Sequence, residues 1–414
     1  MEKRKPFTYI LLFIAAHFFH HLLTALVVPL LPYIRDGFGL TYAQTGLVVS
    51  AFTLAYGIGQ LPAGWLADRI GPKYVLTVGI AGVGLAGAAV GLSIGYGALI
   101  GFLVLMGIAG GGYHPAAAPL ISAAVPAPQR GKALGLHLIG GSSSHFVSPL
   151  AGVAIAGLIG WRGAFVAISV PVFVFGVALF WILTRDDVRA RNGPNTALAR
   201  SNDAAAEIPT RPSVIAVFLV MTATVGAFTG SVIAFIPLFL VDVFGVSQHA
   251  AAVFLSTFFA TGIWASPLGG SISDRFGPLT VFLMLAIAIG PLIVFLGIAP
   301  HLIVVALVML GIGVTLFVRM PVSETYLVTA VRKKNQSTVL GVYFFAGMEA
   351  SGILTPILGH TIDVYGFRAA YVGVGVVLTV IVAVGCIALL SFRRPNLPQS
   401  LVKDRRDKSR ANKR

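Results

Sequence analysis

Charge is what this sequence has least of, since Lys, Arg, Asp and Glu make up only 10% of its 414 residues. Soluble globular proteins carry about 25% charged residues. A chain that is 57% hydrophobic cannot present a soluble surface with so few charges. A soluble enzyme, a nucleic-acid-binding domain and a disordered protein are therefore excluded. The chain has a single cysteine, Cys386, so it can form neither a disulfide framework nor a cysteine metal site.

The chain does have long apolar runs. About 20 apolar residues cross a bilayer core, and the runs here are continuous, without the alternation typical of membrane strands. The first run is too long for a signal peptide, so we expect it to be retained. We predict an all-α membrane protein with twelve transmembrane helices, at residues 8–32, 42–67, 74–93, 97–122, 133–159, 163–184, 213–240, 249–272, 279–299, 302–328, 337–360 and 368–391.

The basic residues are distributed unevenly between the loops. With a cytoplasmic N-terminus, 25 of the 29 Lys and Arg residues fall on the cytoplasmic side. The other side keeps Arg35, Arg162 and Arg368, and Arg319 is left inside a span. This positive-inside asymmetry predicts a multi-pass inner-membrane protein with both termini in the cytoplasm. Topology and attraction to anionic lipids explain the net charge of +15 without nucleic acid.

One short signature occurs twice, 206 residues apart. Gly, Asp-Arg and Gly-Pro recur at the same spacing in 64–72 and in 270–278, and Pro115 and Pro321 have the same separation. An internal repeat of this length predicts two six-helix bundles, 1–184 and 212–392. Between them we expect a cytoplasmic linker at 185–211, and after them a basic cytoplasmic tail at 393–414.

The twelve spans and the repeated signature resemble the major facilitator superfamily. The residues that fit its loop between spans 2 and 3 are Gly64, Leu66, Asp68, Arg69, Gly71, Lys73 and Leu76. Short segments are similar to the fosmidomycin-resistance group of efflux proteins: His17-Phe18, 40–47, 113–117 and 140–142. The sequence departs from many proton-driven exporters at Leu103, where those carry an Arg. The resemblance implies transport by alternating access, with two halves rocking about a central site.

Ionisable groups inside a membrane usually face a cavity or a partner. In the first half they are histidines, and helical spacing places His17 with His21 on one face of span 1 and His137 with His145 on one face of span 5. His114 precedes Pro115 in span 4. We predict that His17, His21, His114, His137 and His145 bind substrate, as the wall of a polar cavity. Interhelical hydrogen bonding and a histidine metal site remain open as alternatives, and we expect no resident metal.

The second half carries the charges. Arg319 in span 10 is permanently protonated and requires an anionic partner, either a protein carboxylate or the substrate. The resemblance implies that spans 1, 4, 7 and 10 line the cavity, so we expect Arg319 to bind substrate and to face His114 across it. A structural pair of Arg319 with Glu324 or Glu349 is the alternative. Glu349 in span 11 and Glu324 in span 10 are proton-coupling candidates, because burial disfavours a charged carboxyl.

The two copies of the signature are interpreted as gates. The resemblance implies that Asp68 meets the N-terminal end of span 11 and Asp274 that of span 5, where a helix dipole favours negative charge. The predicted gate residues are Gly64, Asp68, Arg69, Gly71, Asp274 and Arg275. We expect Asp242, in a loop on the opposite side, to be solvated.

These features predict a secondary transporter rather than an enzyme, because no nucleophile–base set and no ATP-binding loop is found. Our leading hypothesis is proton-coupled efflux of a small anionic or amphiphilic organic compound by a monomer without cofactors. Proton-coupled uptake of a small carboxylate, sugar or other nutrient is the alternative. A membrane receptor that does not transport is a third hypothesis, which the paired Asp-Arg gates disfavour.

Overall fold

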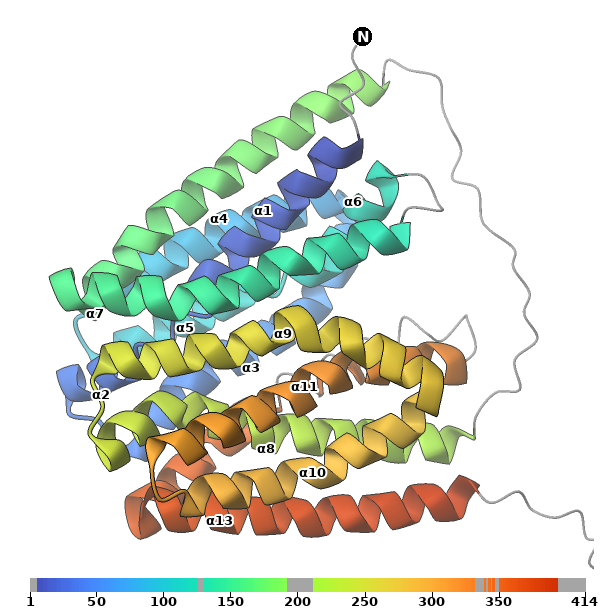
Figure 1. Ribbon diagram of the computed structural model, residues 1–414. Coiled ribbons are helices and arrows are strands. Elements are labelled where there is room, and N and C mark those ends of the chain that lie inside the picture. Colours follow the sequence, from blue (N-terminus) through green and yellow to red (C-terminus); the bar gives the residue numbers. More distant parts are fainter. Residues whose placement is uncertain are drawn as a thin grey trace, which may run out of the picture.

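A computed structural model describes residues 6–125, 130–191, 211–331, 339, 342–343, 345–346 and 350–393. Its described part is helical throughout and contains no strand (Figure 1). The helices of the first half are α1 (Pro6–Thr24), α2 (Leu31–Phe38), α3 (Tyr42–Ile70), α4 (Pro72–Gly91), α5 (Tyr96–Gly110), α6 (Tyr113–Ala124) and α7 (Arg130–Arg191). Those of the second half are α8 (Pro212–Phe244), α9 (Gln248–Phe276), α10 (Pro278–Ile298), α11 (Leu302–Ala330) and α13 (Ser351–Arg393).

Two of these helices each hold two membrane crossings. The dihedral angle φ is +76° at Gly160 in α7 and also +76° at Gly366 in α13, and the helix is interrupted at each glycine. Figure 1 shows α7 doubling back as two arms. Because α5 and α6 together make one crossing, the described helices agree with the predicted fold of twelve transmembrane helices. Residues 337–349 of the eleventh predicted span lie largely outside the described residues.

The first span differs from the continuous helix predicted at 8–32. α1 ends at Thr24, turns follow at 25–30, and α2 begins at Leu31. Pro29 and Pro32 lack backbone N–H groups, and in a continuous helix their rings would clash with the preceding turn. The backbone here forms hydrogen bonds between residues three apart instead of four, such as the bond from Leu26 N–H to the Leu23 carbonyl at 3.1 Å.

The repeated signature forms the same turn in both halves. Gly71 joins α3 to α4 at φ +100°, and Gly277 joins α9 to α10 at φ +80°. A residue with a Cβ rarely adopts such angles. In both turns a proline follows at the first helical position, where its missing N–H costs nothing. We call the end of the bundle with these two turns the motif end and the opposite end, with α2, the far end.

Hydrogen bonds join the two halves at the far end. The carboxylate of Asp363 accepts bonds from the backbone N–H groups of Tyr42 (2.8 Å) and Ala43 (2.9 Å), which begin α3. A carboxylate at a helix N-terminus also interacts favourably with the helix dipole. Glycines let the same helices touch, since a Cβ built on Gly359 lies 2.3 Å from the Tyr42 carbonyl oxygen. The far end is thus closed by backbone-to-backbone packing between α3 and α13.

Candidate functional site

Six histidines meet inside the first half, and we call them the histidine cluster. They come from three helices: His17, His20 and His21 from α1, His114 from α6, and His137 and His145 from α7. The structure therefore brings together all five histidines that the sequence predicted as substrate-binding, and adds His20. Their role as substrate ligands stays a prediction.

Ring contacts hold the cluster together. The ring centroid of His17 lies 4.2 Å from that of His137 in a stacked arrangement, 4.8 Å from that of His21 and 5.6 Å from that of His114. The ring centroid of His21 lies 4.8 Å from that of His145. His17 and His137 are buried, with 4% and 5% of their surface exposed, while His21, His114 and His145 are partly buried.

Hydrogen bonds fix several of these rings. Nδ1 of His17 donates to the carbonyl oxygen of His137 at 3.0 Å, and Nδ1 of His145 donates to the carbonyl oxygen of Gly141 at 2.8 Å. Because these acceptors are carbonyl oxygens, each Nδ1 must carry the proton. In a neutral imidazole the other nitrogen, Nε2, then has a free lone pair. Nδ1 of His21 lies 3.2 Å from the Thr24 hydroxyl oxygen.

Two tyrosines that the sequence analysis did not select complete the cluster. The Tyr113 hydroxyl lies 2.8 Å from Nε2 of His137, and the Tyr56 hydroxyl lies 3.2 Å from Nε2 of His20. Tyr113 is fully buried and its ring stacks on His20 at 4.5 Å. Its position directly before His114 was the only signal in the sequence. Tyr56 had none, because nothing in α3 indicates which face meets α1.

Small residues on α7 make room for α1. A Cβ built on Gly141 lies 2.6 Å from the His17 ring, and one on Gly140 lies 2.1 Å from the Ile14 carbonyl oxygen. Contacts this short do not occur between real side chains, so alanine at either position would push α1 away. The pair Gly140-Gly141 therefore sets how closely His17 approaches α7.

Arg319 is buried inside the second half. It is 5% exposed and borders a narrow void whose lining comes wholly from the second half: Val225, Thr229, Leu285, Ile289, Thr315, Leu316 and Arg319. In the repeat, Arg319 corresponds to Tyr113, while His114 corresponds to Met320. One residue is about 100° around a helix, so Arg319 is directed into its own bundle, as Tyr113 is, and the expectation that it faces His114 is not met.

Within the described residues Arg319 forms no ion pair, and its Nη1 atom is buried without a hydrogen-bond partner. The Thr229 hydroxyl on the same void is also buried without one. Glu324 is partly buried on α11 and is not paired with Arg319 in the described structure. Glu349, the other proton-coupling candidate, lies outside the described residues.

The predicted gate residues are at the motif end. Asp68, Arg69, Asp274 and Arg275 are exposed, and Arg69 lies over the Trp65 ring at 3.9 Å. Gly71 is required by its positive φ, whereas a Cβ on Gly64 would make only an ordinary contact, 3.6 Å from the Pro115 side chain. The start of span 11, which Asp68 is expected to meet, and the side chains of residues 130–132, just before span 5, lie outside the described residues.

Asp242 is not merely solvated. Its carboxylate pairs with the Arg35 guanidinium of the other half through both oxygens, one of them 3.0 Å from Nη2, and accepts a bond from the Tyr42 hydroxyl at 2.8 Å. The side chains of Arg35 and Asp242 are only 16% and 21% exposed. This link carries no signal in the sequence, because the two residues are 207 positions apart in segments without a motif.

The sequence of this chain matches a known family of membrane proteins. The model of the Major Facilitator Superfamily fits residues 13–356 and 218–412. The chain belongs to this superfamily. It is therefore a multi-pass membrane transporter and not an enzyme, as its sequence predicted.

Three relatives illustrate the range of the superfamily. The uncharacterized MFS-type transporter Rv1250 of Mycobacterium tuberculosis is 37% identical over 39% of this chain and 28% of its own length. The probable sulfoacetate transporter SauU of Cupriavidus necator is 34% identical over 37% of this chain and 34% of its own length. The matched segments thus span about a third or less of both relatives. Multidrug resistance protein MdtG of Escherichia coli is 26% identical over 91% of this chain and 92% of its own.

Solved structures share the fold at low identity. A bacterial homolog of the human lysosomal transporter Spinster, in an inward-facing and unoccupied conformation, has a TM-score of 0.79 and 19% identity, covering 94% of this chain and 98% of that one. The D-xylose-proton symporter has a TM-score of 0.73 and 16% identity, covering 94% and 97%. At these identities the likeness concerns the fold.

Proposed function

We propose that this transporter moves a small organic anion across the inner membrane by proton-coupled alternating access, in the direction of efflux. The observation that carries the proposal is Arg319, a cation that is 5% exposed and whose Nη1 has no hydrogen-bond partner among the described residues. An unpaired buried charge costs several kcal/mol. A substrate anion that binds Arg319 would relieve that cost, so the unpaired cation is what an anion-binding site requires.

Two features support an anionic substrate at this place. The unpartnered Thr229 hydroxyl borders the same void as Arg319 and can donate a further hydrogen bond to a carboxylate or sulfonate. The relative SauU is named for sulfoacetate, which carries both groups. The void is narrow in this structure, so substrate entry requires the rearrangement that alternating access provides.

The direction and the coupling rest on other features. MdtG, which aligns along nearly the whole chain, is named as a multidrug resistance protein, and this favours efflux. The basic loops favour a cytoplasmic location for the motif end. Hydrogen bonds close the far end while Asp68 and Asp274 are exposed at the motif end, as in a carrier that faces the cytoplasm. Glu324 and Glu349, carboxyls within or near spans, are the proposed proton carriers.

The test is binding followed by flux. Purified protein is screened by thermal shift against sulfoacetate, simple carboxylates, sugars and antibiotics, and the best ligand is measured in proteoliposomes. Flux should respond to an imposed pH step. Flux that ignores the pH step but follows a sodium gradient would overturn the proton coupling.

Arg319 supplies the decisive variant. Charged hydrogen bonds contribute about 1.5–3 kcal/mol, so Arg319→Ala should weaken anion binding at least about tenfold. Arg319→Lys should recover binding poorly, because an ammonium lacks the planar fork of a guanidinium. Thr229→Val should weaken binding less, and Thr224→Val, at a partly buried position of the same helix that does not line the void, should not change it. Normal binding by an Arg319→Ala protein that melts much earlier would make Arg319 a structural residue.

A further inference from the structure

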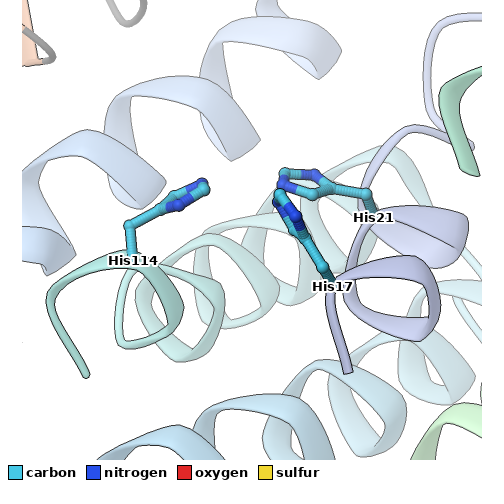
Figure 2. Close-up of side chains that lie close together, drawn as sticks. All are labelled: His17, His21 and His114. Atoms are coloured by element: carbon cyan, nitrogen blue, oxygen red, sulfur yellow. The ribbon is translucent and has the colours of Figure 1, made fainter. Parts of the chain in front are cut away.

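We propose that His17, His21 and His114 form a binding site for a single divalent transition-metal ion. One nitrogen from each of these three imidazoles lies within 4.8 Å of the other two. Figure 2 shows the His114 ring extending from α6 toward the rings of His17 and His21, which lie side by side on α1. The i, i+4 spacing in α1 and the position of α6 thus direct three nitrogen ligands at one point.

The distances are close to those of a metal centre. Three atoms within 4.8 Å of one another lie no more than about 2.8 Å from a common point, against about 2.0–2.1 Å for a zinc–nitrogen bond. Each nitrogen must therefore move by about 0.7 Å or less to bind a metal. Small rotations of the side chains suffice for this, and no helix has to move.

Hydrogen bonds at Nδ1 leave the lone pair of Nε2 available to a metal ion. Metal-binding histidines usually donate their second ring N–H to a carbonyl, carboxylate or other oxygen, which fixes the tautomer and the ring orientation. His17 does so through Nδ1 to the His137 carbonyl at 3.0 Å, and Nδ1 of His21 lies 3.2 Å from the Thr24 hydroxyl. Nε2 of His17 is then its metal-binding atom, and Nε2 of His21 serves in the same way when Nδ1 donates to the Thr24 hydroxyl. His114 makes no hydrogen bond in the described structure and is free to complete the set.

The remaining histidines have other partners. Nε2 of His137 is bonded to Tyr113 and Nε2 of His20 to Tyr56. His145 keeps Nε2 free, because its Nδ1 donates to Gly141, and its ring lies 4.8 Å from that of His21. It can supply a fourth ligand, or that position can remain open to water or an anion, as in metal sites with three protein ligands.

Ligand chemistry selects the class of metal. Imidazole suits Zn²⁺, Cu²⁺, Ni²⁺ and Co²⁺, whereas Mg²⁺ and Ca²⁺ prefer oxygen ligands. Three neutral imidazoles leave the double charge of the ion uncompensated, and the described spans of the first half place no carboxylate in the histidine cluster. An anion from solution in the open position would balance the charge.

The experiment uses full-length protein without an affinity tag, washed with chelator and titrated with Co²⁺. We expect saturable binding of one ion, with the strong visible absorption of four- or five-coordinate cobalt, and displacement by Zn²⁺. Neither measurement needs an organic substrate. Failure here would leave the anion-transport proposal untouched, and anion flux can be measured in the presence of chelator.

His114→Gln is the main variant because it breaks no hydrogen bond of the described structure. Loss of a second-shell partner alone typically costs 10–100-fold in affinity, so loss of a ligand should weaken Co²⁺ binding at least about 100-fold. His301→Gln, at an exposed position outside the cluster, is the control and should bind as the wild type does. His21→Gln provides an independent test if His114→Gln does not fold. A weak six-coordinate spectrum, or equal affinity in wild type and His114→Gln, would overturn the proposed site.

Discussion

Gly359 is the place where a single methyl group should change the conformation of the transporter. A Cβ at this position lies 2.3 Å from the Tyr42 carbonyl oxygen and 2.9 Å from Cα of Ala43, whereas ordinary contacts begin at 3.4 Å. Both neighbours are backbone atoms of α3 and cannot rotate away. In Gly359→Ala the two halves must therefore separate at the far end by about 1 Å, the shortfall from ordinary contact.

The size of the effect follows from the cost of overpacking. An extra methyl group in a packed interior costs about 1–3 kcal/mol, and 1.4 kcal/mol changes an equilibrium tenfold. If that cost falls only on the state with a closed far end, Gly359→Ala shifts the equilibrium toward far-end opening by about 5-fold to 150-fold. Gly373→Ala, in the same helix and with no atom within 4 Å of its Cβ, is the matched control.

Spin-label distances measure this shift. In a Cys386→Ser background, cysteines replace Ile94, which is 95% exposed, and the exposed His301, one in each half at the far end. A second pair replaces Ile70 and Phe276 at the motif end. Gly359→Ala should add longer distances to the first pair and shorter distances to the second. Unchanged distances, or the same change in Gly373→Ala, would refute the steric argument, and far-end opening without motif-end closure would refute the coupling of the two ends.

Two further predictions concern the charged residues at the ends of the bundle. Asp242→Ala removes the pairing with Arg35, which is worth about 1–2 kcal/mol after solvent screening, and should also increase the far-end distances. Asp36→Ala is the control and should not change them, because it removes a carboxylate that lies 2.9 Å from Arg35 within the same half. Asp68→Asn should slow transport in proteoliposomes while leaving substrate affinity within a few-fold, because Asp68 is exposed at the motif end; an equal loss of binding and flux would contradict its role as a gate.

The sequence predicted the fold well because the membrane imposes simple rules. Only helices and closed barrels satisfy every backbone group in lipid, and the runs lack the alternation of barrel strands, so they indicated both the number of crossings and their approximate bounds. The break after Thr24 could not be located, because Pro29 and Pro32 at the end of an apolar run fit either a kinked helix or a broken one. The repeat indicated two bundles, and the positive φ of Gly71 and Gly277 explains physically why that glycine recurs.

The candidate site was predicted less completely, for a geometric reason. Residue type selected the histidines, since ionisable groups are costly in a membrane, but type alone does not indicate which atoms meet. The link between Arg35 and Asp242 joins the ends of two helices, α2 and α8, that are far apart in sequence, so neither residue carried a local signal. The placement of Arg319 was inferred from its helix, whereas the alignment of the repeat, which equates it with Tyr113, would have directed it into the second bundle.

The alignment of the two repeats also shows that the halves carry different polar groups at equivalent positions. Tyr113 and Arg319 occupy equivalent positions, each two residues before a proline, and each is buried in its own bundle. In the first half the buried Tyr113 hydroxyl finds a partner in His137 at 2.8 Å, and the neighbouring histidines keep lone pairs that suit a cation. In the second half the equivalent side chain is a cation with an unpartnered Nη1, which suits an anion. A buried donor without a partner is costly and a satisfied one is not, so the second half has more to gain from a charged ligand. The anion and the metal ion are therefore expected at separate places, and variants of Arg319 and His114 should act on different ligands.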